Sequence, residues 1–66
     1  MFYIINIDRQ AVLTYRDGAR MMYTNKSIAE DRANLAETLS NAKHAIQAAG
    51  NVNIDAMQRM VAPWLK

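Results

Sequence analysis

The most regular pattern of apolar and polar positions in this chain runs from Ser27 to Ala49. The positions of one stripe recur there at intervals of four and three residues, which is the repeat of a helix that packs through one line of its surface. The stripe comprises Ile28, Arg32, Leu35, Leu39, Ala42, Ile46 and Ala49. Good helix formers such as Ala, Leu, Glu, Lys and Gln fill many of the remaining positions. The pattern therefore predicts one long helix over residues 27–49.

Both ends of this predicted helix carry signals of their own. Ser27 is followed three residues later by Glu30, the spacing of a capping box in which both side chains accept backbone N–H groups of the first turn. Gly50 stands where a left-handed residue can end the helix. Arg32 lies within the stripe, and two interpretations stay open for it. Either its stem packs while its guanidinium reaches water, or it is a buried charge paired across an interface.

The first 26 residues follow a shorter rhythm that is typical of strands. Residues 2–7 (FYIINI) are mostly β-branched or aromatic and predict a strand with apolar groups on both faces, for example Ile4 and Ile5. Such a strand is usually central in its sheet or covered on its second side. After a polar break, a second strand is predicted over 11–16 and a third over 19–24.

Asp17 and Gly18 between the last two strands are a strong hairpin signal. The sequence leaves two registers open: a two-residue turn pairs Arg16 with Ala19, and a type I turn with a glycine bulge pairs Tyr15 with Ala19. A slip of one residue moves every side chain to the other face. The residues that face the long helix are therefore either Leu13 and Met22 or Val12 and Met21.

Beyond Gly50 the apolar spacing again favours a helix. Asn53 is a good N-cap, the pattern predicts a short helix over 53–62, and Pro63 should end it and leave residues 63–66 as a tail. The sequence thus predicts a single α+β domain over residues 1–66. Its architecture would be a three-stranded antiparallel β-meander (1–26) followed by a helical hairpin, β-β-β-α-α, with the long helix packed on the sheet.

Length and composition indicate that this domain has a partner. A chain of 66 residues buries only about 60% of its unfolded surface, there is no cysteine for a disulfide, and 52% of the residues are hydrophobic. Oligomerisation is the usual remedy, so we expect a homodimer or a covering protein. The expected interface is the helix seam: Arg32, Leu35, Leu39, Ala42 and Ile46. The expected anchors for a partner are Met57, Met60 and Trp64.

The sequence offers little to catalysis or to cofactors. Both glycines punctuate turns rather than form a phosphate loop, and no cysteine nucleophile exists. His44 is the only histidine, so we expect a surface or rim position for it and no metal site. We predict no enzyme, no cofactor and no small-molecule substrate. No apolar run approaches the roughly 20 residues of a membrane span, and no secretory signal is present, which predicts a cytoplasmic protein.

The sequence supports two functional hypotheses. The leading hypothesis is a protein–protein interaction module that sterically blocks or regulates a larger complex, as small accessory inhibitors of phages and mobile elements do. It requires the stripe from Ile28 to Ala49 to be buried between the strands and another polypeptide segment. The alternative is a nucleic-acid-binding protein or small transcriptional regulator whose sheet stacks bases on tyrosine and holds phosphates with arginine. Its candidate contacts are Arg9, Arg16, Arg20 and Tyr15.

Overall fold

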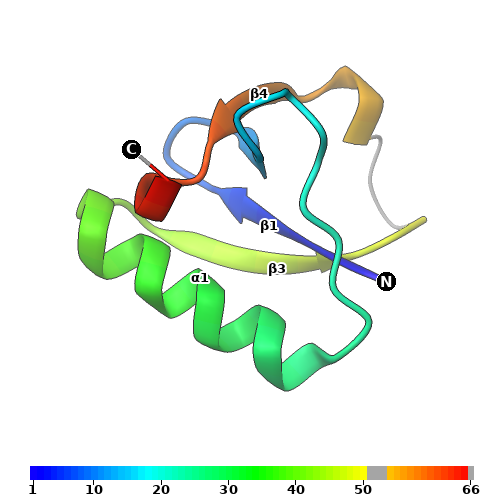
Figure 1. Cartoon of the computed structure of the whole chain (residues 1–66), viewed down its shortest axis with the longest axis horizontal. Coiled ribbons are helices and arrows are strands. Elements are labelled where there is room, and N and C mark those ends of the chain that lie inside the picture. The colour runs from blue at the N-terminus through cyan, green and yellow to red at the C-terminus, as the bar shows by residue number, and fades with distance from the viewer. Residues whose placement is uncertain (51–53, 66) are drawn as a thin grey trace.

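The computed structural model describes residues 1–50 and 54–65 and contains, in these ranges, one α-helix and a four-stranded mixed sheet (Figure 1). In chain order the elements are β1 (Phe2–Asn6), β2 (Ala11–Thr14), α1 (Lys26–Ser40), β3 (His44–Ala48), the 3₁₀ turn η1 (Ile54–Ala56), β4 (Gln58–Val61) and the 3₁₀ turn η2 (Pro63–Leu65). The strand order is β3-β1-β2-β4. The predicted three-stranded meander with a helical hairpin is therefore wrong, although an α+β fold with an N-terminal strand is correct.

Strand β1 lies in the middle of the sheet, as its two apolar faces predict. It pairs antiparallel with β2 on one side, where Ile5 faces Val12, and antiparallel with β3 on the other, where Ile4 faces Ile46. Ile4 is buried in the cluster beneath α1, whereas Ile5 belongs to a second cluster on the opposite face. A central strand needs a neighbour on each edge to pair its backbone, and this requirement shapes the rest of the fold.

The predicted hairpin forms, but its second arm is not a strand. Tyr15 N–H donates to the carbonyl of Ala19 (2.9 Å) and Gly18 has φ of +89°, which is the register with a glycine bulge. From there residues 15–25, the crossing segment, run from β2 towards β1. They form single bridges from Arg20 to Thr14 of β2 and from Tyr23 to Phe2 of β1. Because the pairing is divided between two strands, no continuous ladder develops over residues 19–24.

This register also decides which side chains face the helix. Met21 N–H donates to the carbonyl of Leu13 (3.1 Å), so these two residues lie opposite one another and both are buried in the cluster beneath α1. Val12 lies in the cluster on the other face, and Met22 is exposed. Neither combination expected from the sequence is correct, since the structure pairs Leu13 with Met21.

Helix α1 begins earlier than predicted, and the capping box is absent. Asn25 is the N-cap, and its Oδ1 accepts from Ile28 N–H (3.2 Å). Ser27 is the second helical residue, so its hydroxyl is past the cap position. Asn25 is at least as good an N-cap as Ser27 would be. The backbone of Asn25 is extended, as is typical of an N-cap residue, so the helix begins at the next residue, Lys26.

The predicted helix is also too long by nine residues, because α1 ends at Ser40 rather than at Ala49. Asn41 adopts the left-handed conformation (φ 55°) and its N–H closes the helix on the carbonyl of Glu37 (2.9 Å). The chain then returns as β3 and pairs with the free edge of β1. Long-range strand pairing here outweighs the helix propensity of the alanines.

A strand and two 3₁₀ turns replace the predicted second helix. Residues 58–61 form β4, which runs parallel to β2 and pairs Leu13 with Met60. All four residues of β2 are buried, as expected of a strand covered on both faces and both edges. Pro63 follows β4 and opens η2 instead of ending a helix. The proposed cap at Asn53 lies outside the described residues.

Candidate functional site

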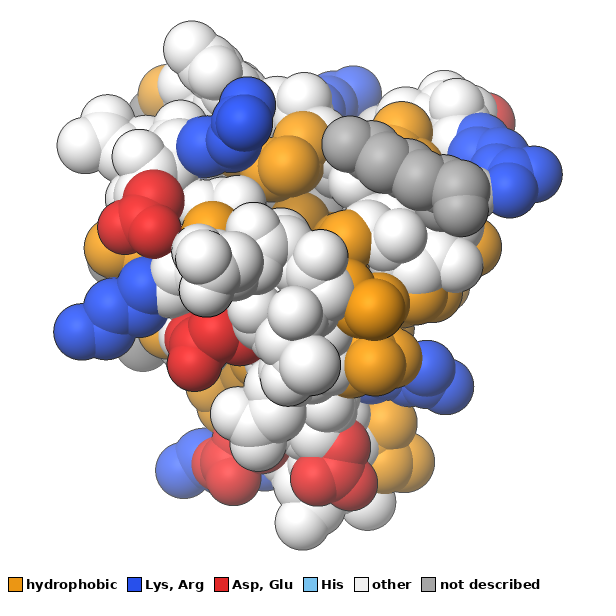
Figure 2. All heavy atoms as spheres, turned by 90° about the vertical axis from the view of Figure 1, so that its left-hand side faces the viewer, with side chains coloured by type: hydrophobic (Ala, Val, Ile, Leu, Met, Phe, Trp, Pro, Cys, Tyr) orange, Lys and Arg blue, Asp and Glu red, His pale blue; other side chains and the backbone are white. Residues whose placement is uncertain are grey.

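Helix α1 has a buried side and an exposed apolar side. The buried side consists of Ala29, Ala33 and Ala36, whose small side chains let the helix lie close to the sheet. The exposed side carries Ile28, Leu35 and Leu39, which are 48%, 37% and 54% exposed. Figure 2 looks onto the end where α1 finishes and shows apolar side chains gathered along one side of the helix.

The expected seam is thus corrected in two respects. Its helical part, Ile28 to Leu39, faces solvent instead of being buried. Its second part is not helical: Ala42 follows the helix cap, and Ile46 lies in β3 with its side chain against the core cluster. A continuous buried stripe from Ile28 to Ala49 does not exist. An interaction role therefore cannot depend on a buried seam and must depend on the exposed side of α1.

Arg32 and Trp64 join this side of the helix to the C-terminal turn. The Arg32 guanidinium lies over the Trp64 ring, with its carbon 5.6 Å from the ring centroid, a cation–π contact. Arg32 itself is exposed, which matches the interpretation in which its charged end reaches water. Trp64 is half-buried and packs on the core cluster through η2. Its packing places the indole at the surface beside the exposed helix side.

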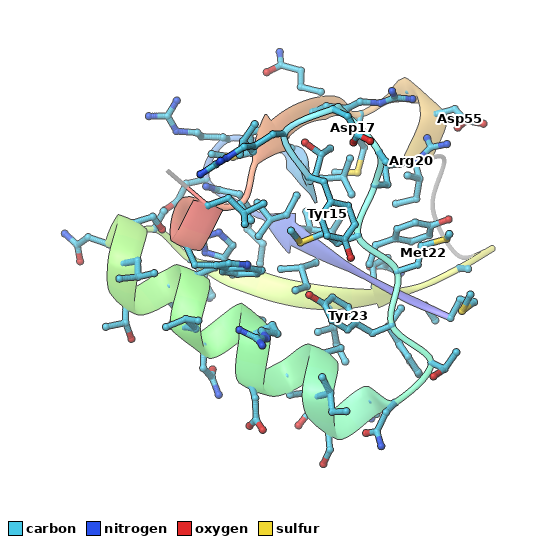
Figure 3. The ribbon with its side chains drawn as sticks, viewed as in Figure 1. Tyr15, Asp17, Arg20, Met22, Tyr23 and Asp55 are labelled. Atoms are coloured by element: carbon cyan, nitrogen blue, oxygen red, sulfur yellow. The ribbon has the colours of Figure 1, made fainter. Side chains whose placement is uncertain are left out.

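Two tyrosines of the crossing segment extend the same surface (Figure 3). Tyr23 is half-buried against the core cluster, and Tyr15 is exposed. Burial raises the pKa of the Tyr23 hydroxyl above its usual 10.0, the neighbouring Tyr15 adds to the rise, and Arg32 opposes it, so these groups lie within electrostatic reach of one another. We call this surface the aromatic face. It comprises Tyr15, Tyr23, Ile28, Arg32, Leu35, Leu39 and Trp64.

The raised pKa of Tyr23 predicts a loss of stability at alkaline pH. The unfolded chain releases this proton near pH 10, whereas the folded chain holds it to higher pH, so the free energy of unfolding falls as the pH rises above about 10. The free energy of unfolding, measured in urea at about pH 9 and about pH 11, should fall less between these two pH values for Tyr23→Phe than for wild type. Tyr3→Phe, on the other face of the sheet, is the control and should behave as wild type does.

Side-chain contacts hold the crossing segment in place. Asp17 Oδ1 accepts from Ala19 N–H (2.9 Å) in the turn. Arg16 donates through Nε (2.9 Å) and Nη2 to the carbonyl of Leu65 in η2. Arg20 Nη1 lies 2.5 Å from Asp55 Oδ1, an ion pair that ties the segment to η1 (Figure 3). These contacts join the segment to both 3₁₀ turns.

The candidate nucleic-acid contacts do not form one basic surface. Arg16 is engaged with a backbone carbonyl and Arg20 with a carboxylate, so both have partners within the fold. Arg9 lies in the turn between β1 and β2 and borders cavities that do not include Arg16 or Arg20. Tyr15 alone of the four belongs to the aromatic face. The predicted arrangement of arginines and tyrosines along strands is absent from the described residues.

Two of the three predicted anchors are poorly placed to meet a partner. Met57 packs on the cluster of the face opposite α1. Met60 packs on the core cluster, and its sulfur accepts from Asn6 Nδ2 (3.5 Å). Trp64 is the one anchor that lies on the aromatic face.

His44 is buried, contrary to the expected surface position. Its backbone N–H donates to Glu37 Oε1 (2.8 Å), and its Nδ1 lies 2.8 Å from the carbonyl of Ala42. A carbonyl only accepts, so Nδ1 carries the proton, and Nε2 has no partner among the described residues. His44 is the first residue of β3, where it pairs with Asn6 of β1.

A surface cavity of about 630 Å³ lies at this end of the molecule and is lined by Asn6, Arg9, Leu39 and Met60, among others. Asn6 is fully buried, and its Oδ1 accepts from Arg9 N–H (3.0 Å). Within the described part of the chain, no three His, Asp or Glu side chains come together as metal ligands. None of the described helices combines the length and hydrophobicity of a membrane span.

Comparisons with known proteins return no match from protein-family models, curated proteins or solved structures.

Two residues of the aromatic face, Tyr23 and Ile28, were not among the candidate contacts expected from the sequence. Ile28 has a solvent-facing role instead of the buried one expected. One signal for this role is the run of alanines at 29, 33 and 36, a helical stripe of small residues suited to close packing on a sheet.

Proposed function

We propose that this chain is a non-catalytic module that binds a larger protein through the aromatic face. The observation that supports this proposal most is the composition of the face: one Trp, two Tyr and one Arg adjoin three exposed aliphatic side chains. Tyr, Trp and Arg are the residue types enriched at interfaces, where a few of them supply most of the binding energy. The chain would act by covering a surface of its target, as accessory inhibitors of phages and mobile elements do.

The face also suggests the chemistry of its partner. Ile28, Leu35 and Leu39 offer an apolar line along α1, and Arg32 places an exposed positive charge within that line. A matching partner would present an apolar patch with a carboxylate opposite Arg32, because a guanidinium at an interface favours a carboxylate in bidentate geometry. Nucleic acid is the weaker alternative, since Arg16 and Arg20 already have partners within the fold.

Leu35→Glu tests the proposal, with Thr38→Glu as a matched control. Both substitutions add one carboxylate to an exposed position of α1, but only Leu35 lies on the aromatic face. The tagged full chain is used to capture its target from a lysate of the native host, and binding of the purified target is then titrated. We expect Leu35→Glu to weaken binding at least about tenfold and Thr38→Glu to leave it unchanged.

Equal binding by the two variants would contradict the proposal. So would binding that depends on nucleic acid and falls steeply with salt, because that dependence is the property of phosphate contacts.

A further inference from the structure

Strand β3 is one edge of the sheet, and its outer backbone groups can be assigned from the pairing with β1. Just before β3, the carbonyl of Lys43 accepts from Ile7 N–H (2.8 Å). Just after β3, Ala49 N–H donates to the carbonyl of Met1 (2.9 Å). In an antiparallel pair the hydrogen-bonded residues alternate, so odd-numbered residues of β3 bond to β1. The N–H and C=O groups of His44, Ile46 and Ala48 therefore point away from β1.

Most of these outer groups have no partner among the described residues. His44 N–H is the exception, because Glu37 of α1 reaches over the edge to accept it (2.8 Å). Ile46 and Ala48 each present one donor and one acceptor to the outside, and no hydrogen bond within the described chain uses them. Two donors and two acceptors in a row are the pattern that an antiparallel strand would complete.

Natural proteins usually protect such an edge with charged side chains or Pro, and at β3 such side chains lie near its first residue, where exposed Lys43 precedes the strand and Glu37 accepts from His44 N–H. Residues 44–48 (HAIQA) contain no Lys, Arg, Asp, Glu or Pro. The opposite edge strand, β4, contains the exposed Arg59 and is followed closely by Pro63. The β3 edge is therefore guarded near His44 and open to pairing from Ala45 to Ala48.

We propose that β3 pairs antiparallel with β3 of a second copy of this chain, about a two-fold axis at Gln47. Ile46 of each copy then exchanges N–H···O=C bonds with Ala48 of the other, which satisfies all the outer groups of both residues. The edge is self-complementary in this register. The bond from His44 to Glu37 is retained, whereas an axis at Ile46 would require it to break. The two sheets join into one eight-stranded sheet.

The aromatic face remains free in such a dimer. Glu37 reaches the outer edge of β3, whereas Arg32 lies on the side of α1 that meets Trp64. The dimer interface and the aromatic face thus use different sides of the helix. A dimer therefore presents two aromatic faces, and the pairing of β3 can be tested independently of the proposed function.

A single cysteine at Gln47 tests both the pairing and its register. The chain has no native cysteine, and Gln47 lies opposite Gln47 of the second copy in a non-hydrogen-bonded pair, with Cα atoms about 4.5 Å apart. Oxidised Gln47→Cys should form a covalent dimer at least about ten times faster than Gln58→Cys, an exposed position of β4 that measures random collision. Ala45→Cys should match this control, because its two copies lie too far apart for a disulfide.

Sedimentation of the full chain completes the test. Wild type should be a dimer at micromolar concentration, and Ala48→Pro should be monomeric with an unchanged circular dichroism spectrum, since it removes only an outward N–H. Ala48→Ser keeps this donor and should remain dimeric. A monomeric wild type, equal cross-linking at positions 47 and 58, or a strand of another protein bound at this edge would each overturn the proposal.

Discussion

Replacing Leu13 by alanine should lower the free energy of unfolding by about 2–5 kcal/mol, the usual cost of removing a buried leucine side chain. Leu13 is fully buried in β2, between Met60 of β4 and Met21 of the crossing segment, and it packs in the cluster beneath α1. Domains of this size rarely have more than about 3–5 kcal/mol of stability. The variant should therefore be largely unfolded at room temperature, as measured by urea denaturation followed by circular dichroism.

Leu39→Ala is the matched control for this prediction. It removes the same atoms from a leucine that is 54% exposed, so its stability should stay within about 0.5 kcal/mol of wild type. If Leu39→Ala unfolds the protein while Leu13→Ala does not, the assignment of the buried and exposed sides is wrong.

Replacing Ala36 by leucine should destabilise the fold by about 1–3 kcal/mol. Ala36 is fully buried where α1 lies against the sheet, in the same cluster as Ile4 and Ala62. The added atoms must push the helix away from the sheet or force side chains from their preferred rotamers, although leucine is a good helix former. The measurement is the midpoint of thermal or urea unfolding.

Thr38→Leu provides the comparison on the same helix. Thr38 is exposed, so leucine there meets no neighbouring core and replaces a poorer helix former. Its stability should equal or slightly exceed that of wild type. A stable Ala36→Leu variant would mean that α1 does not approach the sheet through its alanines.

Local chemistry allowed some of these features to be predicted from the sequence. Residues 2–7 predict a central strand because their apolar side chains need cover on both faces. Asp17 and Gly18 predict a turn because both residues favour tight backbone geometry, and the observed register is one of the two expected. These features depend on neighbours within a few residues.

The end of the helix could not be predicted in the same way. Asn41 and Gly50 can both adopt the left-handed conformation, and both do so here. Local propensity favours continuing through the alanines to Gly50. The deciding contact is the pairing of β3 with β1, more than 35 residues away in the sequence, as in Ile4 with Ile46.

The same limit applies to the site. Heptad spacing singled out Ile28, Leu35 and Leu39 because they are large and apolar, and it assigned them to the interior. The structure instead buries the alanines, because a small side chain allows a close approach of helix and sheet. Tyr23 joins the aromatic face only because the crossing segment returns to β1, which no local pattern indicates.

The most direct test of this account is whether residues 44–48 form a strand beside β1. In a non-hydrogen-bonded antiparallel pair the two Cα atoms lie about 4.5 Å apart, so nuclear Overhauser spectra of the labelled protein should show strong contacts between the Hα atoms of Ile4 and Ile46. The same contact is predicted for Asn6 and His44. Sequential amide contacts continuing from Asn41 through Ala49, with no Hα contacts to β1, would indicate one long helix and contradict both the four-stranded sheet and the aromatic face.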